Sequence, residues 1–177
     1  MPPQHRRDPI RMVPHRAAWA DDFERERRRL TAVLRPWLAG DIEHIGSTAV
    51  PGLPAKPIID MATRIGAYPD GVAAIAPLAR IGWAHAPEPG DETGRKWSFC
   101  FPDPGLRTHH LHVYEESDPL VPKLIAFRDH LRRCPEDAAD YARLKTALAA
   151  ADPQDRPRYR AGKAPFIEGV LARLNDR

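Results

Sequence analysis

The chain has 177 residues and a mass of 19.9 kDa, a size that fits one globular domain and leaves little room for a second core. With 42% hydrophobic and 29% charged residues, the composition excludes wholesale disorder, and no apolar run approaches the roughly 20 residues of a membrane span. The formal net charge of +3 gives no clear sign of nucleic-acid binding, while basic residues suit a phosphate-bearing small molecule equally well. Because we also recognise no secretory signal, we expect a cytoplasmic protein.

The first half of the chain predicts a flexible start followed by helices and strands. Residues 1–15 are expected to form a flexible N-terminal segment. Apolar residues then recur at helical spacing, which predicts a long helix, although Pro36 favours an earlier end. Two strands follow, the second of them interrupted by Asp60, and then a helix that Gly82 closes. The predicted elements are a helix over 16–39, strands over 41–45 and 57–65, and a helix over 69–82.

The second half of the chain predicts a strand pair and a helical tail. Residues 85–94 are rich in proline, glycine and acidic residues and are expected to form an exposed loop. Apolar and polar residues alternate over 96–101 and 108–114, which predicts two antiparallel strands joined by a short loop. Three predicted helices follow, at about 120–133, 136–150 and 164–175.

The order of these elements predicts a single domain over residues 1–177. We expect an α/β fold of the α+β kind, in which helices flank a mixed β-sheet. Residues 120–177 are then the helical C-terminal part of the same domain.

A tight turn precedes a strand with a single acid. Gly46 permits a close approach of the backbone, and the hydroxyl groups of Ser47 and Thr48 suit a phosphate group. Asp60 lies among apolar residues, where an unpaired carboxylate would be costly, so we interpret it as a functional residue bound to a partner or a metal ion. In the alternative interpretation Ser47 only caps a helix and Asp60 pairs with a nearby base, Arg64 or Lys56.

Two histidines lie two residues apart on a predicted strand. Alternation places His110, His112 and Tyr114 on one face of this strand and Leu111 on the core side. Two imidazoles at this spacing converge on one metal ion or one phosphate, and Asp60 would share the ion if the two strands are neighbours. Ordinary surface histidines are the alternative interpretation.

Several other charged residues are candidates for the same site. The basic side chains that we expect to face phosphate groups are those of Lys56, Arg107, Arg128, Lys145 and Lys163. Each of them alone is more often solvated or ion-paired. Glu43 precedes the turn and is a further candidate metal ligand.

The run from Glu43 to Asp60 resembles the signature of the GrpB family (UPF0157-type). The resemblance continues, in the same order, through residues 107–113, 127–132, 141–145 and 159–167. It therefore covers nearly the whole chain, and it implies a nucleotidyltransferase-like fold.

The resemblance also implies roles for individual residues. In nucleotidyltransferase-like proteins a Gly-Ser pair holds the triphosphate, and acids on the next strand bind divalent metal ions. Gly46 and Ser47 match the pair and Asp60 matches the first acid, which implies Mg²⁺ or Mn²⁺ and catalytic roles for Ser47 and Asp60. Ala62 stands where the second acid is expected, although two-metal phosphoryl chemistry needs several carboxylates.

Three functions remain open at this point. The leading hypothesis is a domain that binds a nucleotide or another phosphate-bearing ligand with a divalent metal and catalyses nucleotidyl transfer. The second is a catalytically inactive module that binds a CoA-type or nucleotide-type ligand. The third is a histidine-based phosphoester hydrolase, because residues 110–114 partly resemble the histidine-triad motif, with Tyr114 in place of the third histidine. The sequence does not determine whether the protein is an enzyme or what its oligomeric state is.

Overall fold

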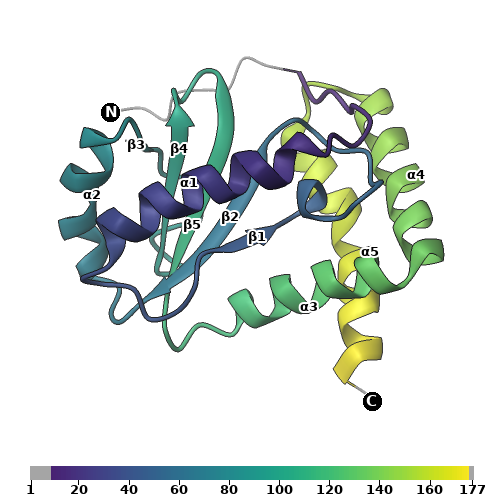
Figure 1. Cartoon of the computed structure of the whole chain (residues 1–177). Coiled ribbons are helices and arrows are strands. Elements are labelled where there is room, and N and C mark those ends of the chain that lie inside the picture. The colour runs from purple at the N-terminus through teal and green to yellow at the C-terminus, as the bar shows by residue number, and fades with distance from the viewer. Residues whose placement is uncertain (1–8, 176–177) are drawn as a thin grey trace.

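One five-stranded sheet forms the centre of the molecule (Figure 1). The computed structural model describes residues 9–175, and the sheet has the strand order β1-β2-β5-β4-β3. The helices are α1 (Ala18–Leu34), α2 (Asp70–Arg80), α3 (Leu120–Arg133), α4 (Pro135–Ala151) and α5 (Arg156–Asn175). The strands are β1 (Glu43–Ile45), β2 (Ile59–Ile65), β3 (Ala84–His85), β4 (Lys96–Pro102) and β5 (Arg107–Glu115), and a short 3-10 helix covers Ser47–Ala49.

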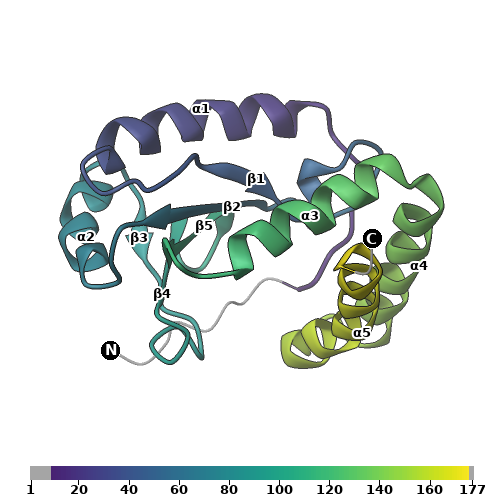
Figure 2. The same cartoon turned by 90° about the horizontal axis from the view of Figure 1, so that it is seen from below.

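The sheet is mixed, as the sequence predicts. Strands β2 and β5 run parallel, whereas β1 pairs with β2, β4 with β5 and β3 with β4 in antiparallel fashion. Figure 2 shows α1 on one side of the sheet and α3 on the other, with α4 and α5 standing beside the sheet. This arrangement confirms the α+β fold with flanking helices.

The main core lies between the sheet and α1 and α2. Leu30 and Leu34 of α1 pack there with Met61 of β2 and with Leu111 and Val113 of β5, and all five side chains are buried. Because side chains alternate along a strand, Asp60, His110 and His112 point to the other face of the sheet. The predicted two faces of the histidine strand are therefore confirmed.

The bounds of two helices differ from those predicted. Helix α1 ends at Leu34 and not at residue 39, because Pro36 lacks the N–H group that a further helical turn requires. Helix α5 begins at Arg156, well before residue 164, because the Asp155 carboxylate accepts a hydrogen bond from the Arg158 N–H at 2.9 Å and caps the first turn.

Part of the N-terminal segment is packed onto the domain. We expected residues 1–15 to be flexible, but Ile10 is buried and Val13 exchanges two backbone hydrogen bonds with Ala55. The rest of that expectation falls on residues 1–8, which lie outside the described residues. Within the described part of the chain, no helix is long and apolar enough to cross a membrane.

Candidate functional site

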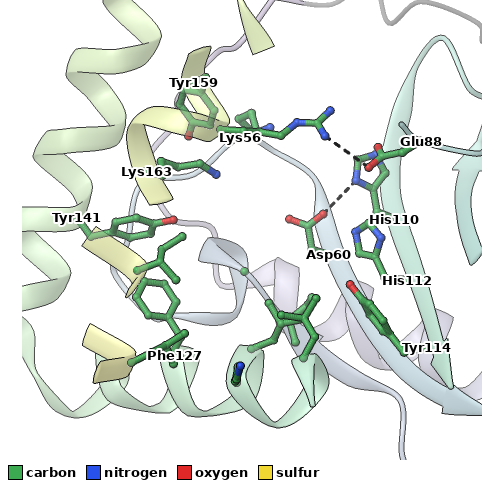
Figure 3. Close-up of a pocket in the computed structure, with 18 of the residues that line it drawn as sticks. Lys56, Asp60, Glu88, His110, His112, Tyr114, Phe127, Tyr141, Tyr159 and Lys163 are labelled. Carbon is green, nitrogen blue, oxygen red and sulfur yellow. Dashed lines mark hydrogen bonds and ion pairs between the residues drawn. The ribbon is translucent and has the colours of Figure 1, made fainter. Parts of the chain in front are cut away.

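A cavity of about 330 Å³ opens on the face of the sheet opposite α1 (Figure 3). Strands β2 and β5 form one wall, and helices α3, α4 and α5 form the others. Figure 3 shows Asp60 between the histidines of β5 on one side and two lysines on the other. The polar residues that line the cavity include Lys56, Asp60, Glu88, His110, His112, Arg160 and Lys163. The aromatic and apolar lining residues include Ile45, Tyr114, Leu124, Phe127, Tyr141, Tyr159 and Ile167.

Asp60, His110 and His112 form a candidate metal site. The parallel register places Asp60 beside His110 and Ala62 beside His112, and one potential ligand atom from each of Asp60, His110 and His112 lies within 4.8 Å of the others. The Nδ1 atom of His110 lies 3.1 Å from Oδ1 of Asp60. Two buried ring nitrogens, Nε2 of His110 and Nδ1 of His112, have no hydrogen-bond partner among the described residues. An ionised carboxylate and two imidazole groups whose potential ligand atoms lie this close together suit a bound cation.

The protonation states of these groups also suit metal binding. Burial alone would raise the pKa of Asp60, but the hydrogen bond from His110 and the charge of the two histidines outweigh it and hold the pKa well below its usual value. Burial lowers the pKa of His112 to about 4. At neutral pH the site therefore offers an ionised carboxylate and a neutral imidazole, the forms that coordinate metals.

Gly46 allows the turn after β1 to lie against Asp60. Its φ is +70°, and a Cβ atom built there would lie 2.9 Å from Oδ2 of Asp60. Glycine is thus required for two reasons: the positive φ is strained for other residues, and a side chain at this position would collide with the Asp60 carboxylate.

The two hydroxyl groups of the turn are engaged within the fold. The Lys145 ammonium of α4 donates hydrogen bonds to Oγ of Ser47 and to the Pro54 carbonyl, both at 2.7 Å. The Thr48 hydroxyl lies 3.0 Å from Nε2 of His44. Gly46 lines the cavity, but neither Ser47 nor Thr48 is among its lining residues.

Two of the five predicted phosphate-binding bases line the cavity. Lys56 and Lys163 both lie over the Tyr159 ring, with Nζ 5.2 Å and 4.6 Å from its centroid. Burial lowers the pKa of Lys163, an effect that the negative charge of Asp60 opposes. Two lysines that face one carboxylate across a cavity provide an excess of positive charge for an anionic ligand.

The other three bases are not among the lining residues, and Lys145 is the one that binds Ser47 and Pro54. Arg128 binds Glu43 at 2.7 Å and donates to the His44 carbonyl at 3.0 Å, at a separate hollow beside α1. Arg107 donates to the Pro104 carbonyl at 3.0 Å and lies 3.5 Å from Glu88. Neither arginine lines the cavity, and Glu43 is likewise absent from its lining and from the metal cluster.

No second acid joins the metal cluster in residues 9–175, although Glu88 lines the same cavity and interacts electrostatically with His110 and His112. Ala62 is buried, Glu43 pairs with Arg128, and Glu115 pairs with Arg95 at 2.8 Å. The cluster around Asp60 therefore resembles a site for one metal ion and not for two.

Sequence reasoning missed Glu88 and Arg160, which also line the cavity. Glu88 follows β3 in an irregular segment, where no periodicity marks the direction of a side chain. Arg160 lies 4.0 Å from Glu88 and belongs to a stripe at helical spacing on α5. That stripe of cavity residues is Arg156, Tyr159, Arg160, Lys163 and Ile167, and it could have been recognised if the helix had been predicted to begin at residue 156.

Comparison with known proteins gives consistent matches over most of the chain. The family described as GrpB protein matches residues 9–173. The UPF0157 protein YqkA of Bacillus subtilis (strain 168) is 35% identical over 160 residues, which make up 90% of this chain and 45% of YqkA. The UPF0157 protein PA4798 of Pseudomonas aeruginosa is 39% identical over 170 residues, or 94% of this chain and 68% of that protein.

A solved structure shares the fold. The crystal structure of conserved protein GrpB from Enterococcus faecalis is 31% identical in sequence and superposes with a TM-score of 0.79. The match covers 92% of this chain and 96% of the other. Together, the match to residues 9–173 and the relatives above 30% identity show that the chain belongs to the GrpB family.

Proposed function

We propose that the domain binds a nucleotide or another phosphate-bearing small molecule at one divalent metal ion. The observation that carries this proposal is the position of the candidate ligands Asp60, His110 and His112 opposite Lys56 and Lys163 in a single cavity. A phosphate group bound between them would contact positive charge on both sides. The aromatic and apolar residues toward α3 and α5 would pack against the organic part of the ligand.

The residues of the chain would divide the work among them. When bound, the metal ion would polarise a phosphoryl oxygen as a Lewis acid. Lys56 and Lys163 would bind the remaining phosphate oxygens, and Tyr159 holds both ammonium groups over its ring. Gly46 keeps the turn close enough to Asp60 to orient its carboxylate. The helices around the cavity would limit access of water to the phosphate.

Metal-dependent nucleotidyl transfer is the reaction that we propose for this site. It follows from the resemblance to nucleotidyltransferase-like proteins and from the placement of Asp60, which matches the first acid of that pattern. An acceptor hydroxyl group would attack the α-phosphorus of the nucleoside triphosphate, the bond between the α- and β-phosphates would break, and pyrophosphate would leave. The lysines would stabilise the negative charge that develops on the transferred group.

A binding module without catalysis is the second candidate. The observation that favours it is that no second carboxylate belongs to the metal cluster in the described part of the chain. Ala62 is buried there, and Glu43 and Glu115 are paired elsewhere. In this case the same ligand would bind with the same metal dependence but would not react.

Calorimetry with defined ligands tests the proposal. ATP, GTP, CTP, UTP and CoA are titrated into the protein in the presence and absence of Mn²⁺, and the titrations are repeated with Asp60→Asn. We expect one class of ligand to bind only with metal, and to lose binding in Asp60→Asn but not in Asp140→Asn, which neutralises an exposed carboxylate on α4. Binding that is unchanged in Asp60→Asn would show that the ligand does not use this cavity.

Product analysis then separates the two candidates. The bound nucleoside triphosphate is incubated with the metal-loaded protein, and pyrophosphate release is measured. Release that depends on Asp60, with water or an added alcohol as the acceptor, identifies transfer activity, and tight binding without release favours the module.

A further inference from the structure

We infer that the cluster of Asp60, His110 and His112 is built for a divalent transition-metal ion and not for Mg²⁺, and that Ser98 is a positioning residue for His112. The inference rests on the proposed function, because it names the class of metal that this function would use.

The donor set is the first argument. Two of the three candidate ligands are imidazole groups and only one is a carboxylate. Mg²⁺ prefers oxygen ligands and gives up its water molecules reluctantly, whereas imidazole nitrogens suit iron, cobalt, nickel, copper and zinc. Two histidines with one carboxylate also leave coordination positions open for water or a ligand.

The orientation of the His110 ring is the second argument. His110 is only 7% exposed, and its Nε2 atom has no hydrogen-bond partner although Nδ1 lies beside Asp60. Because Nδ1 faces the carboxylate, Nδ1 and not Nε2 is the atom of His110 that can share an ion with Asp60. An ion bound there would take the place of the contact between the two side chains.

Ser98 is placed to form a hydrogen bond with the ring nitrogen of His112 that does not bind the metal. Ser98 of β4 is the direct cross-strand neighbour of His112, so their side chains lie on the same face of the sheet. It is only 3% exposed, and its Oγ atom, like Nδ1 of His112, is buried without a hydrogen-bond partner. A histidine that binds a metal through one nitrogen normally uses the other in a hydrogen bond. The Ser98 hydroxyl is the buried polar group placed to form it.

The same strand provides a control. His109 is also buried, but it points to the opposite face of β5, where it packs near Trp83 and Phe101. Its Nδ1 atom already has a partner, the Thr108 hydroxyl at 2.8 Å. Removing this imidazole changes the histidine content of the strand without changing the cluster.

Cobalt binding tests the metal class. Co²⁺ is titrated into protein without an affinity tag, and the visible absorption of the bound ion is recorded. We expect binding of one ion, displacement by Zn²⁺, and little displacement by a roughly 100-fold excess of Mg²⁺. The spectrum should be lost in His110→Ala and His112→Ala and retained in His109→Gln. Displacement of Co²⁺ by equimolar Mg²⁺, or an unchanged spectrum in His112→Ala, would overturn the assignment.

Substitution of Ser98 tests its positioning role. We expect Ser98→Ala to bind Co²⁺ about 10-fold more weakly and with an altered visible spectrum, and Ser98→Thr, which keeps the hydroxyl, to restore both. The melting temperature of each metal-free variant shows whether the fold is intact. Equal affinity and an identical spectrum in Ser98→Ala would exclude the role of Ser98.

Failure of this inference and failure of the proposed function give different results. If Mg²⁺ binds at Asp60 as tightly as Zn²⁺ and supports ligand binding, only the metal class is wrong. If Zn²⁺ or Co²⁺ binds at the cluster but the metal-loaded protein binds no phosphate-bearing ligand, the metal site is right and the proposed function is wrong.

Discussion

Single residues determine the geometry of the cavity, and Gly46 is the clearest example. It carries a positive φ, and its missing side chain leaves room for the carboxylate of Asp60. Lys145 is the second example, since it is only 1% exposed and ties α4 to the turn through Ser47 and Pro54. Both residues act on Asp60 and its turn from outside the metal cluster.

Gly46→Ala is predicted to weaken metal binding as well as stability. Gly52→Ala is the matched control, because Gly52 has a similar φ of +78° but nothing within 4 Å of the added Cβ. Both variants should lose about 1–2 kcal/mol of unfolding free energy to backbone strain. Only Gly46→Ala should also lose affinity for Co²⁺, since the new methyl group displaces Asp60. Equal Co²⁺ affinity in the two variants, measured by visible absorption, would contradict this account.

Lys145 is predicted to make stability depend on pH. Burial is the main cause that lowers the pKa of Lys145 to about 7 in the folded protein, from an ordinary value of 10.5. Between these two values the unfolded chain binds a proton that the folded protein does not, so stability increases as the pH rises. From pH 7 to pH 9 this residue should contribute an increase of about 1–2 kcal/mol.

Urea unfolding at several pH values measures this effect. We expect Lys145→Met to remove the increase in stability between pH 7 and pH 9. This expectation holds whether the variant is more or less stable than the wild type at any single pH. Lys123→Met, which replaces an exposed lysine on α3, should keep it. A change of stability between pH 7 and pH 9 that is the same in the wild type and in Lys145→Met would show that the buried ammonium stays charged.

At the scale of elements, β2, β5 and α5 build the two charged walls of the cavity. The parallel pairing of β2 with β5 places Asp60 beside His110, although 50 residues separate them in sequence. Helix α5 faces these strands with Lys163 and Arg160, and the Arg160–Glu88 pair connects it to the segment after β3.

Lys163→Met is predicted to weaken binding of the phosphate-bearing ligand. Loss of one charged hydrogen-bond donor in a closed site should reduce affinity about 10-fold, since such bonds contribute about 1.5–3 kcal/mol. Arg158→Met removes an exposed cation from the same helix outside the cavity and is the control. Calorimetry with the ligand that binds the wild type compares the two variants. A larger loss in Arg158→Met than in Lys163→Met would place the anion elsewhere.

Much of the sheet could be predicted from the sequence, because its signals are local. Alternation along β5 predicted that His110 and His112 share a face, and the acid within an apolar strand marked Asp60 as a candidate site residue. Local signals do not show what a side chain meets in the folded chain. Ser47 was therefore expected at a phosphate group but binds Lys145, and Arg128 was expected there but binds Glu43.

At the scale of the whole molecule, the C-terminal helices turn an open sheet face into a cavity. Helices α3 and α5 supply its apolar walls, and their packing depends on contacts far apart in the sequence, which no local pattern specifies. Because the sequence predicted a later start for α5, it did not indicate that Arg160 and Lys163 lie on one face of the same helix. The cavity is thus formed jointly by the sheet and the helical part of the chain.

Phosphorus NMR on the metal-loaded protein tests the central claim most directly. The spectra of ATP and of inorganic phosphate are recorded with protein that carries paramagnetic Mn²⁺, with protein that carries Zn²⁺, and with Asp60→Asn. If the ligand phosphate lies at the metal held by Asp60, His110 and His112, Mn²⁺ should broaden the phosphorus signal strongly in the wild type. Zn²⁺ should leave the signal sharp, and Mn²⁺ should not broaden it in Asp60→Asn. A phosphate signal that is equally sharp with Mn²⁺ and Zn²⁺, or equally broadened in wild type and Asp60→Asn, would contradict the account.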